Sequence, residues 1–484
     1  MYSRIGSNRG SFLPWMGPLP FAMALLNLIL WPTAGGAQGV IASGTTWNDT
    51  AGSPIEAHGG GLIKVGSTYY WVGEDHSTAN SFSGLNCYSS TDLVNWTFVN
   101  DVMPVQSSGL LTSAAVVQRP KILYNAATST YVLWMHIDNS SYSLNYAGVA
   151  TSPSVCGTYT FIGGSQPLGF PSFDMGVFED TNGTAYLLTT DNNVGLRIEQ
   201  MATNYQSVVS VAAELPSMEA PAMLKIGSTY YIFCSHLSGW AANDNEYATA
   251  TSITGSWSTL KDFAPSGTDT YTSQTNWIQA IAGTGGTTYV YMGDRWNSSN
   301  LPTSLADSTY IWLPLTISGN TVSMPWYNRW TLNVAAGTWS ITDTSFETGR
   351  PVNIVNSATG YCLDVTGASS KEGVQLDAWT CNSGSNQNWT MSAEGGGYYV
   401  TSQLDGQVMD DSGASKQSGG AIIQWDANGG TNQQWTFTSN GSGAYTIKSV
   451  DSGLCLQPAS TAAGALMEQV TCNGSSSQLW KIVD

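Results

Sequence analysis

Polar side chains recur at two fixed positions around a repeated aromatic hairpin. Five stretches place a polar or Gly-rich turn before an aromatic strand, and their tyrosines are Tyr69, Tyr131, Tyr186, Tyr230 and Tyr289. Five residues after each tyrosine stand Glu74, His136, Asp191, Ser235 and Asp294. A similar distance before each turn stand His58, Gln118, Asp174, Glu219 and Gln274. Carboxyl and amide groups bind hydroxyls, and paired carboxyls transfer protons, so we expect chemistry at these hairpin ends.

A fold that uses these residues together must bring the open ends of five hairpins to one place. Residues equidistant from a hairpin turn are cross-strand neighbours, so each polar pair should lie side by side. The tyrosines recur at intervals of 44 to 62 residues, and small sheets repeating at about 40–50 residues or slightly more are typical of propellers. The repeats predict an all-β protein with a five-bladed β-propeller. The alternative is a β-sandwich, which gives no reason for polar pairs to recur symmetrically about the turns.

The C-terminal part of the chain repeats on a different period. Its markers, 46 and 45 residues apart, are Gln387-Asn388-Trp389, Gln433-Gln434-Trp435 and Gln478-Leu479-Trp480. Three Gln-X-Trp repeats at this spacing predict a three-fold β-trefoil, and the segment resembles the ricin-type lectin, also called carbohydrate-binding module family 13. We expect these three tryptophans to belong mostly to the core.

The lectin resemblance implies sugar contacts in two of the three lobes. In lobe one the matching acidic, aromatic and amide residues are Asp364, Trp379 and Asn382. In lobe two they are Asp410, Trp425 and Asn428. Lobe three has Gln457 and Val470 in place of the acidic and aromatic residues. We therefore expect two sugar sites and one structural lobe.

The seven cysteines divide between the two repeat regions. Equivalent positions in lobes one and three predict two disulfides, Cys362 with Cys381 and Cys455 with Cys472, as expected of an exported protein. The propeller region holds an odd number, Cys87, Cys156 and Cys234. At least one of these should be a free, buried thiol.

Composition and targeting signals indicate a secreted protein that binds neutral ligands. The chain has 33 acidic and 15 basic residues and a net charge of −18, which excludes nucleic acid and anionic membranes as partners. Its 19 tryptophans and few charges suit hydroxyl-rich ligands that stack on aromatic rings. Residues 1–37 have the basic region, short apolar core and small-residue end of a secretory signal, and no later segment is long enough to span a bilayer. We expect an extracellular monomer.

Other catalytic motifs are absent from the sequence. The four histidines form no His-Glu-X-X-His motif, and neither histidines nor cysteines have metal-ligand spacing. The chain has no Gly-rich phosphate loop and no Gly-X-Ser-X-Gly elbow. We expect neither a metal nor a cofactor.

Motifs spread over residues 52–340 resemble glycoside hydrolase family 43, and most closely its exo-β-1,3-galactanase branch. They include Ala57-His58-Gly59, Tyr69-Tyr70-Trp71-Val72-Gly73-Glu74, Arg119-Pro120-Lys121, Ser172-Phe173-Asp174, Glu219-Ala220-Pro221, His236-Leu237-Ser238-Gly239-Trp240 and Gly293-Asp294-Arg295-Trp296. The resemblance implies a five-bladed propeller that hydrolyses glycosides with inversion.

The resemblance makes Glu219 the general acid and Asp174 the group that adjusts its pKa. A neighbouring carboxylate raises the pKa of an acid by charge repulsion, as this chemistry needs. The alternative for Asp174 is a strand-end carboxylate that caps a turn. The family's usual N-terminal catalytic Asp is missing at Ala57-His58-Gly59, and the resemblance gives Gln274 the task of holding the nucleophilic water. Either an imidic tautomer of Gln274 takes the proton of the water, or Gln274 only positions the water and another group accepts the proton. Glu74 is the nearest candidate in the sequence for that group.

The resemblance also predicts a set of substrate contacts, namely Glu74, Gln118, His58, Trp240 and Asp294. Gln118 stands where the galactanase branch carries a Glu, which changes the contact to sugar hydroxyls. Trp240 is expected to stack on the sugar, and its alternative is a core tryptophan at a strand end.

Together these patterns predict four segments: a signal at 1–37, a propeller hydrolase at 38–340, a linker at 341–350 and a trefoil at 351–484. The predicted activity is an inverting exo-β-1,3-galactanase that acts on galactan or arabinogalactan. Two alternatives are an arabinofuranosidase or β-xylosidase of the same family, and a catalytically weakened galactan-binding lectin.

Overall fold

The computed structural model describes residues 39–78, 81–216, 218–297, 303–341, 349, 351–382, 384–440 and 443–483. The predicted signal at 1–37 lies outside these residues, as does most of the predicted linker at 341–350. The described chain is built from strands joined by short helical turns. No helix in these ranges is long and apolar enough to cross a membrane.

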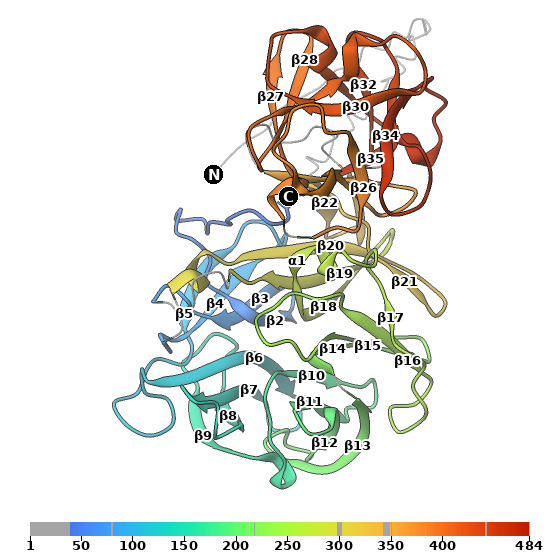
Figure 1. Cartoon of the computed structure of the whole chain (residues 1–484). Helices are drawn as coiled ribbons and strands as arrows, with labels where there is room; N and C mark the ends of the chain where they lie inside the picture. The colour runs from blue at the N-terminus through green and yellow to red at the C-terminus, as the bar shows by residue number, and fades with distance from the viewer. Residues whose placement is uncertain are drawn as a thin grey trace, which may run out of the picture. The chain divides into compact units, whose positions relative to one another are not determined.

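Five four-stranded antiparallel sheets follow one another along the first part of the chain (Figure 1). They are β2 (His58–Val65), β3 (Thr68–Glu74), β4 (Leu85–Ser90) and β5 (Thr97–Asp101); β6 (Ala115–Asn125), β7 (Thr130–Asn139), β8 (Tyr146–Ser152) and β9 (Thr160–Ser165); β10 (Met175–Glu179), β11 (Ala185–Asp191), β12 (Gly195–Met201) and β13 (Val208–Pro216); β14 (Met218–Ile226), β15 (Thr229–His236), β16 (Glu246–Ala250) and β17 (Lys261–Asp262); β18 (Gln274–Gly283), β19 (Gly286–Arg295), β20 (Thr309–Ser318) and β21 (Thr321–Ser323). Three helical turns interrupt them: η1 (Pro167–Gly169), α1 (Asp269–Thr272) and η2 (Thr303–Asp307).

The first strands of these sheets surround a common axis. Taken in chain order, each of the strands β2, β6, β10, β14 and β18 contacts the next in space, and β18 closes the cycle by contacting β2. This is the radial arrangement of a propeller, and it brings the first residue of each hairpin to one end of the axis.

The predicted count of five blades was wrong by one, because the described residues of the propeller region form six sheets. The sixth is a three-stranded sheet of β1 (Val40–Ala42), β22 (Arg329–Asn333) and β23 (Thr338–Ile341). It pairs the beginning of the propeller region with its end. Its strands lack the repeated tyrosine hairpin from which the sheets were counted.

Four hairpins pair the predicted polar residues across their strands. The pairs are His58 with Glu74, Gln118 with His136, Glu219 with Ser235 and Gln274 with Asp294. Each of these hairpins has a register shift just after its first polar residue. Bulges of this kind bend a strand and re-aim side chains beside active sites.

The fifth predicted pair, Asp174 with Asp191, was wrong by one residue. Asp174 lies opposite Thr190, whose backbone N–H donates to the Asp174 carbonyl at 2.9 Å. The β10–β11 ladder has no register shift, so counting by analogy with the bulged hairpins misplaces it. The Asp191 carboxylate instead pairs with Arg197.

The trefoil is built from twelve strands: β24 (Val352–Asn356), β25 (Cys362–Val365), β26 (Leu376–Trp379), β27 (Asn388–Glu394), β28 (Gly397–Ser402), β29 (Val408–Asp411), β30 (Gly420–Trp425), β31 (Trp435–Ser439), β32 (Tyr445–Ser449), β33 (Cys455–Pro458), β34 (Ala465–Val470) and β35 (Leu479–Val483). Short turns η3 (Thr366–Ala368), η4 (Ser385–Gln387), η5 (Ser412–Ala414), η6 (Thr431–Gln433) and η7 (Ser476–Gln478) lie between them.

The three marker tryptophans of the trefoil are fully buried, which confirms that they belong to the core. Each indole N–H donates to a backbone carbonyl of its own lobe, in the pairs Trp389 with Leu363, Trp435 with Met409 and Trp480 with Leu456. The repeat of the same bond explains the regular spacing, because each lobe needs an apolar ring with one donor at this position.

The disulfide predictions are confirmed. Cys362 is bonded to Cys381, and Cys455 is bonded to Cys472. In the propeller Cys87 and Cys156 form a third disulfide, which leaves Cys234 as a buried free thiol.

Candidate active site

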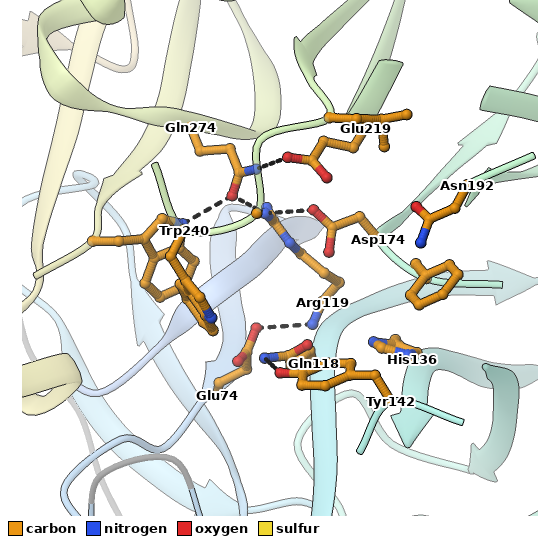
Figure 2. A pocket seen from close by; sticks show the side chains of 14 residues that line it. Glu74, Gln118, Arg119, His136, Tyr142, Asp174, Asn192, Glu219, Trp240 and Gln274 are labelled. Carbon is orange, nitrogen blue, oxygen red and sulfur yellow. Dashed lines mark hydrogen bonds and ion pairs between the residues drawn. The ribbon is translucent and has the colours of Figure 1, made fainter. Parts of the chain in front are cut away.

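A pocket opens at the end of the propeller axis where the hairpins meet (Figure 2). Six of the predicted site residues line it, namely Glu74, Gln118, Asp174, Glu219, Trp240 and Gln274. The two others, His58 and Asp294, are only 1% exposed and do not line it. Asp294 accepts the backbone N–H of Gly59 at 2.5 Å, and His58 stacks on Tyr310, so both lie in the wall behind the pocket.

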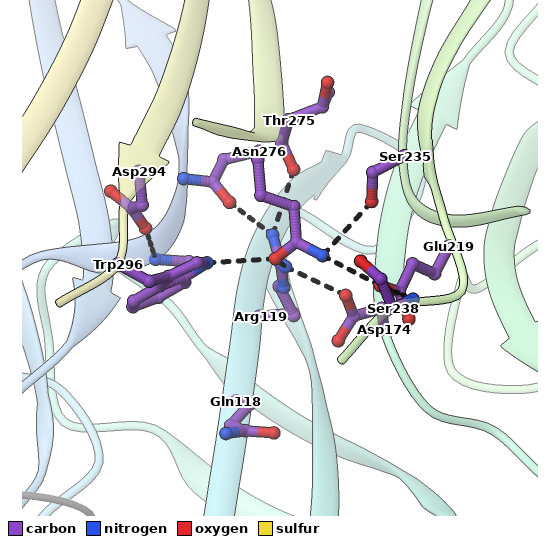
Figure 3. Close-up of polar contacts among 12 residues, drawn as sticks. Gln118, Arg119, Asp174, Glu219, Ser235, Ser238, Thr275, Asn276, Asp294 and Trp296 are labelled. Atoms are coloured by element: carbon purple, nitrogen blue, oxygen red, sulfur yellow. Dashed lines mark hydrogen bonds and ion pairs between the residues drawn. The ribbon is translucent and has the colours of Figure 1, made fainter. Parts of the chain in front are cut away.

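A buried guanidinium connects the polar residues of the pocket (Figure 3). The Arg119 backbone N–H donates to Glu74 Oε1 at 2.9 Å. The guanidinium donates to the Asp174 carboxylate at 2.8 Å, to the side-chain oxygens of Gln274 and Asn276, and to the carbonyl of Thr275 at 3.0 Å. Burial lowers the pKa of Arg119, but the surrounding carboxylates outweigh burial and raise the pKa above its ordinary value. Arg119 therefore stays charged and holds residues from three other hairpins.

Backbone conformation aims Arg119 at the pocket. Arg119 has a φ of 55°, and the residues after the first polar position of two other bulged hairpins, Gly59 and Ala220, have φ values of 57° and 50°. This left-handed conformation is uncommon for residues with a side chain. At the bulge it turns the residue out of the ladder, so the guanidinium reaches across the axis.

The hydrogen bonds of Gln274 define the orientation of its amide. Its Oε1 accepts from the guanidinium of Arg119 and from Nε1 of Trp296, the latter at 2.9 Å. Its Nε2 donates to Glu219 Oε1 and to Ser235 Oγ, both at 3.1 Å. Guanidinium and indole groups can only donate, so a flipped amide would set N–H against N–H. The oxygen must therefore face Arg119 and Trp296.

Glu219 combines partial burial with a nearby negative charge. Burial and then the charge of Asp174 raise the pKa of Glu219 to about 8. Its carboxyl accepts the N–H of Ser238 at 3.3 Å, on the loop that leads to Trp240. A carboxyl group that keeps its proton at neutral pH can serve as a proton donor.

The other side of the pocket is formed by Gln118, His136, Tyr142 and Asn192 (Figure 2), and by Phe173, whose ring centroid lies 5.8 Å from that of His136. Gln118 Nε2 donates to the Tyr142 hydroxyl at 3.4 Å, and His136 Nε2 contacts the Asp138 carboxylate at 3.2 Å. On the opposite side, Trp240 and Trp296 meet edge to face with their ring centroids 5.2 Å apart. The pocket thus combines aromatic walls with hydroxyl-binding groups, which suits a sugar.

Sequence reasoning did not assign Arg119, Tyr142, Asn192 and Trp296 to the site. Arg119 and Trp296 lie inside quoted motifs, next to Gln118 and two residues after Asp294, and these positions could have been included. Tyr142 and Asn192 lie on loops after β7 and β11, for which the repeat gave no signal. In the described part of the chain, no group of three or more His, Cys, Asp or Glu side chains could hold a metal ion.

The two predicted sugar sites of the trefoil have matching geometry. In lobe one Asn386 Nδ2 donates to Asp364, and in lobe two Asn432 Nδ2 donates to Asp410 at 3.0 Å. The aromatic residues Trp379 and Trp425 are 46% and 38% exposed, as stacking platforms should be. Asn386 and Asn432 were missed, although each stands three residues before its marker tryptophan.

The third lobe lacks this arrangement. Gln457 replaces the carboxylate, and its Nε2 donates to Glu468 at 3.2 Å, while its Oε1 accepts from Gln478. Val470 occupies the platform position and Ser477 the position of the donating asparagine.

The fold and the pocket define a propeller hydrolase joined to a lectin. Residues 60–297 match the family model for glycosyl hydrolases family 43, and residues 350–480 match the ricin-type beta-trefoil lectin domain. The chain is 35% identical to an exo-β-1,3-galactanase from Clostridium thermocellum, covering 92% of this chain and 100% of that chain with a TM-score of 0.63. The chain belongs to glycosyl hydrolases family 43.

Two further solved structures are similar. A variant of an exo-β-1,3-galactanase from Phanerochaete chrysosporium with β-1,3-galactotriose is 30% identical, with 92% of this chain and 100% of that chain covered and a TM-score of 0.62. A putative exo-β-1,3-galactanase from Bifidobacterium bifidum is 32% identical, with 59% and 96% covered and a TM-score of 0.57. A search of curated proteins found no match.

Proposed function

We propose that the protein is an inverting exo-β-1,3-galactanase that releases galactose from the non-reducing end of β-1,3-galactan, including the backbone of arabinogalactan. The observation that carries the proposal is the Glu219 carboxyl with its raised pKa, beside Asp174 and Gln274 in one pocket. The similar proteins named as exo-β-1,3-galactanases support the choice of glycan.

Glu219 acts as the general acid that protonates the glycosidic oxygen. The negative charge of Asp174 disfavours the ionised form of Glu219, so Glu219 keeps its proton. The Arg119 guanidinium holds the Asp174 carboxylate at 2.8 Å. This division of roles between two carboxyl groups is the one that glycoside hydrolysis requires.

Gln274 orients the attacking water in its ordinary amide form. An imidic tautomer would carry an O–H on Oε1, where Arg119 and Trp296 already direct two N–H groups. The amide N–H that bonds Glu219 can instead donate to the oxygen of a water once substrate engages Glu219. The proton of that water then passes to a carboxylate, and Glu74 lines the same pocket.

Gln118 and Tyr142 contact sugar hydroxyls on the other side of the pocket, and Trp240 stacks on the apolar face of galactose. The Gln118 side chain can bind a sugar hydroxyl through either its amide oxygen or its N–H groups, because an amide both accepts and donates hydrogen bonds. His58 and Asp294 support the wall through Tyr310 and the backbone of Gly59.

The trefoil holds the enzyme on the polymer through lobes one and two. Two weak sites on one module increase residence on a repeating chain without any new contact in the pocket. We propose that the enzyme is a secreted monomer with the segments 1–37, 38–340, 341–350 and 351–484. Its three disulfides fit an oxidising compartment.

The test measures free galactose released from linear β-1,3-galactan by the wild type, by Glu219→Gln and by Glu214→Gln as a control. Glu214 undergoes the same chemical change outside the pocket. We expect Glu219→Gln to lose on the order of 10²–10⁴-fold in kcat and to keep its affinity for polymer, while the control stays active. Arabinose or xylose release from aryl glycosides, without galactose from galactan, would identify the alternative enzyme. Polymer binding without any hydrolysis would identify a lectin.

A further inference from the structure

The segment immediately before Gln274 has an unusual backbone. Four consecutive residues of α1, Asp269 to Thr272, have φ values of 50°, 52°, 60° and 57°. None is glycine, so each L-residue is held in the left-handed helical region that sterics disfavour. Such conformations persist only where surrounding contacts fix them, and they are concentrated at functional sites.

Buried side chains hold this left-handed turn in place. Thr270 is fully buried, and its Oγ1 accepts the backbone N–H of Asn245 at 2.6 Å. The Tyr271 hydroxyl donates to the Met324 carbonyl at 2.8 Å. Ser273 Oγ donates back to the Thr270 carbonyl at 2.6 Å, which links the turn to the start of β18.

The side chain of Asn245 bonds to both residues that flank Gln274. Its Nδ2 donates to the carbonyl of Ser273 at 3.1 Å. Its Oδ1 accepts the backbone N–H of Thr275 at 2.9 Å and the Thr275 hydroxyl at 2.8 Å. Asn245 is only 1% exposed and stands just before β16, a strand of the neighbouring sheet. These bonds fix the backbone on either side of Gln274.

We propose that Asn245, together with the left-handed turn, is a positioning residue that sets the place of the Gln274 amide between Glu219 and Arg119. The proposal rests on the proposed role of Gln274 in catalysis. This role gives a reason for the four strained residues of the turn. If the turn relaxed to an ordinary conformation, residue 274 could rotate away from the axis. The amide of Asn245 suits this position, because the side chain must donate to a carbonyl on one side and accept an N–H on the other.

The first test substitutes Asn245→Asp, which keeps the shape but sets a carboxylate oxygen against the Ser273 carbonyl. We expect kcat on galactan to fall on the order of 10- to 100-fold, because small misplacement of a catalytic group has effects of this size, while KM changes by less than about 2-fold. In a Gln274→Ala background the same substitution should cause no further loss of kcat. Equal losses in both backgrounds would overturn the proposal.

A matched pair tests the turn itself. Thr270→Ser keeps the hydroxyl that accepts the Asn245 backbone N–H and should retain a kcat near that of the wild type. Thr270→Val has nearly the same shape but lacks the hydroxyl, and it should lower kcat. Tyr247→Phe is the control, because the Tyr247 hydroxyl, on strand β16 close to Asn245, bonds the Asn320 carbonyl and the Val322 N–H and none of the residues of this cluster. If Tyr247→Phe lowers both the melting temperature and kcat as much as Thr270→Val does, the effect is general destabilisation and the proposal fails.

Crystal structures of the wild type and Asn245→Asp separate this proposal from the proposed function. A displaced Gln274 side chain with Glu219 unmoved would support positioning even if galactan proves not to be the substrate. An unmoved Gln274 would overturn positioning even if the wild type is an active galactanase.

Discussion

The pocket of the propeller and the lobes of the trefoil use polar and aromatic side chains in opposite ways. In the propeller, each hairpin contributes different residues, and one arginine joins them: the Arg119 backbone N–H bonds Glu74, and its guanidinium bonds Asp174 and Gln274. In the trefoil, lobes one and two each carry their own set of carboxylate, asparagine and tryptophan. The first arrangement makes one site that no single repeat contains, and the second makes independent copies. Substitutions should therefore act together in the pocket and separately in the lobes.

Among the variants that compare the pocket with the lobes, the largest effect is expected from Arg119→Met. The substitution removes the bonds to Asp174 and Gln274 and leaves a partly buried carboxylate unpaired. We expect kcat/KM to fall on the order of 10²–10³-fold or more, and the free energy of unfolding to fall by about 3–5 kcal/mol. Kinetics and thermal unfolding measure the two effects.

Arg197→Met is the matched control, since it removes a second buried arginine that pairs with Asp191 and Glu214 outside the pocket lining. It should lose stability and retain most of its kcat. Equal losses of kcat in the two variants would mean that Arg119 acts only through stability, and the contrast between pocket and lobes would be broken.

The pH profile tests the coupling between Asp174 and Glu219. Since burial and Asp174 raise the pKa of Glu219 to about 8, the acid is protonated below that pH, and kcat/KM should fall as the pH rises through about 8. Asp174→Asn removes the repulsion, lowers the pKa of Glu219 and should move this alkaline limb to lower pH, besides lowering the rate. A limb that stays in place would show that Asp174 does not set this pKa.

The lobes should respond additively. We expect Asp364→Asn and Asp410→Asn each to weaken polymer binding about 10-fold, and the double variant on the order of 100-fold, in affinity electrophoresis. Hydrolysis of galactotriose should not change in any of the three. Complete loss of binding in one single variant would show that the lobes are not independent.

A smaller difference should separate the two lobes. Asp364 faces Asp377 across the β25–β26 ladder, and burial followed by the charge of Asp377 raises the pKa of Asp364 to about 7. In lobe two Asp410 faces Ile423 instead. If the sugar hydroxyl needs the carboxylate form, binding by lobe one should weaken as the pH falls through about 7. Asp377→Asn should move this loss to lower pH, and an unchanged pH dependence would contradict the assignment.

Repetition explains how much of the molecule the sequence could predict. The lobes, their disulfides and their core tryptophans followed from spacing, because each lobe repeats the same contacts. Four of the five polar pairs in the propeller followed for the same reason. The sixth sheet could not be counted, since β1, β22 and β23 lack the repeated hairpin.

The features that the sequence did not predict depend on backbone geometry, which cannot be recognised from the residue types. The role of Arg119 requires a left-handed φ at a bulge, and the missing bulge in β10–β11 shifts Asp191 away from Asp174. Asn245 contacts residues 273 and 275 only because its sheet packs against the neighbouring sheet that contains β18. Contacts between different repeats are the ones that spacing within a repeat cannot predict.

The most direct test of the account follows the anomers of galactose by NMR while the wild type digests linear β-1,3-galactan. The account predicts that α-galactose appears first and then mutarotates, as an inverting exo-enzyme with Glu219 as acid and Gln274 as the water-holding residue requires. If β-galactose appears first, or longer fragments appear without galactose, the proposed arrangement of the site is contradicted.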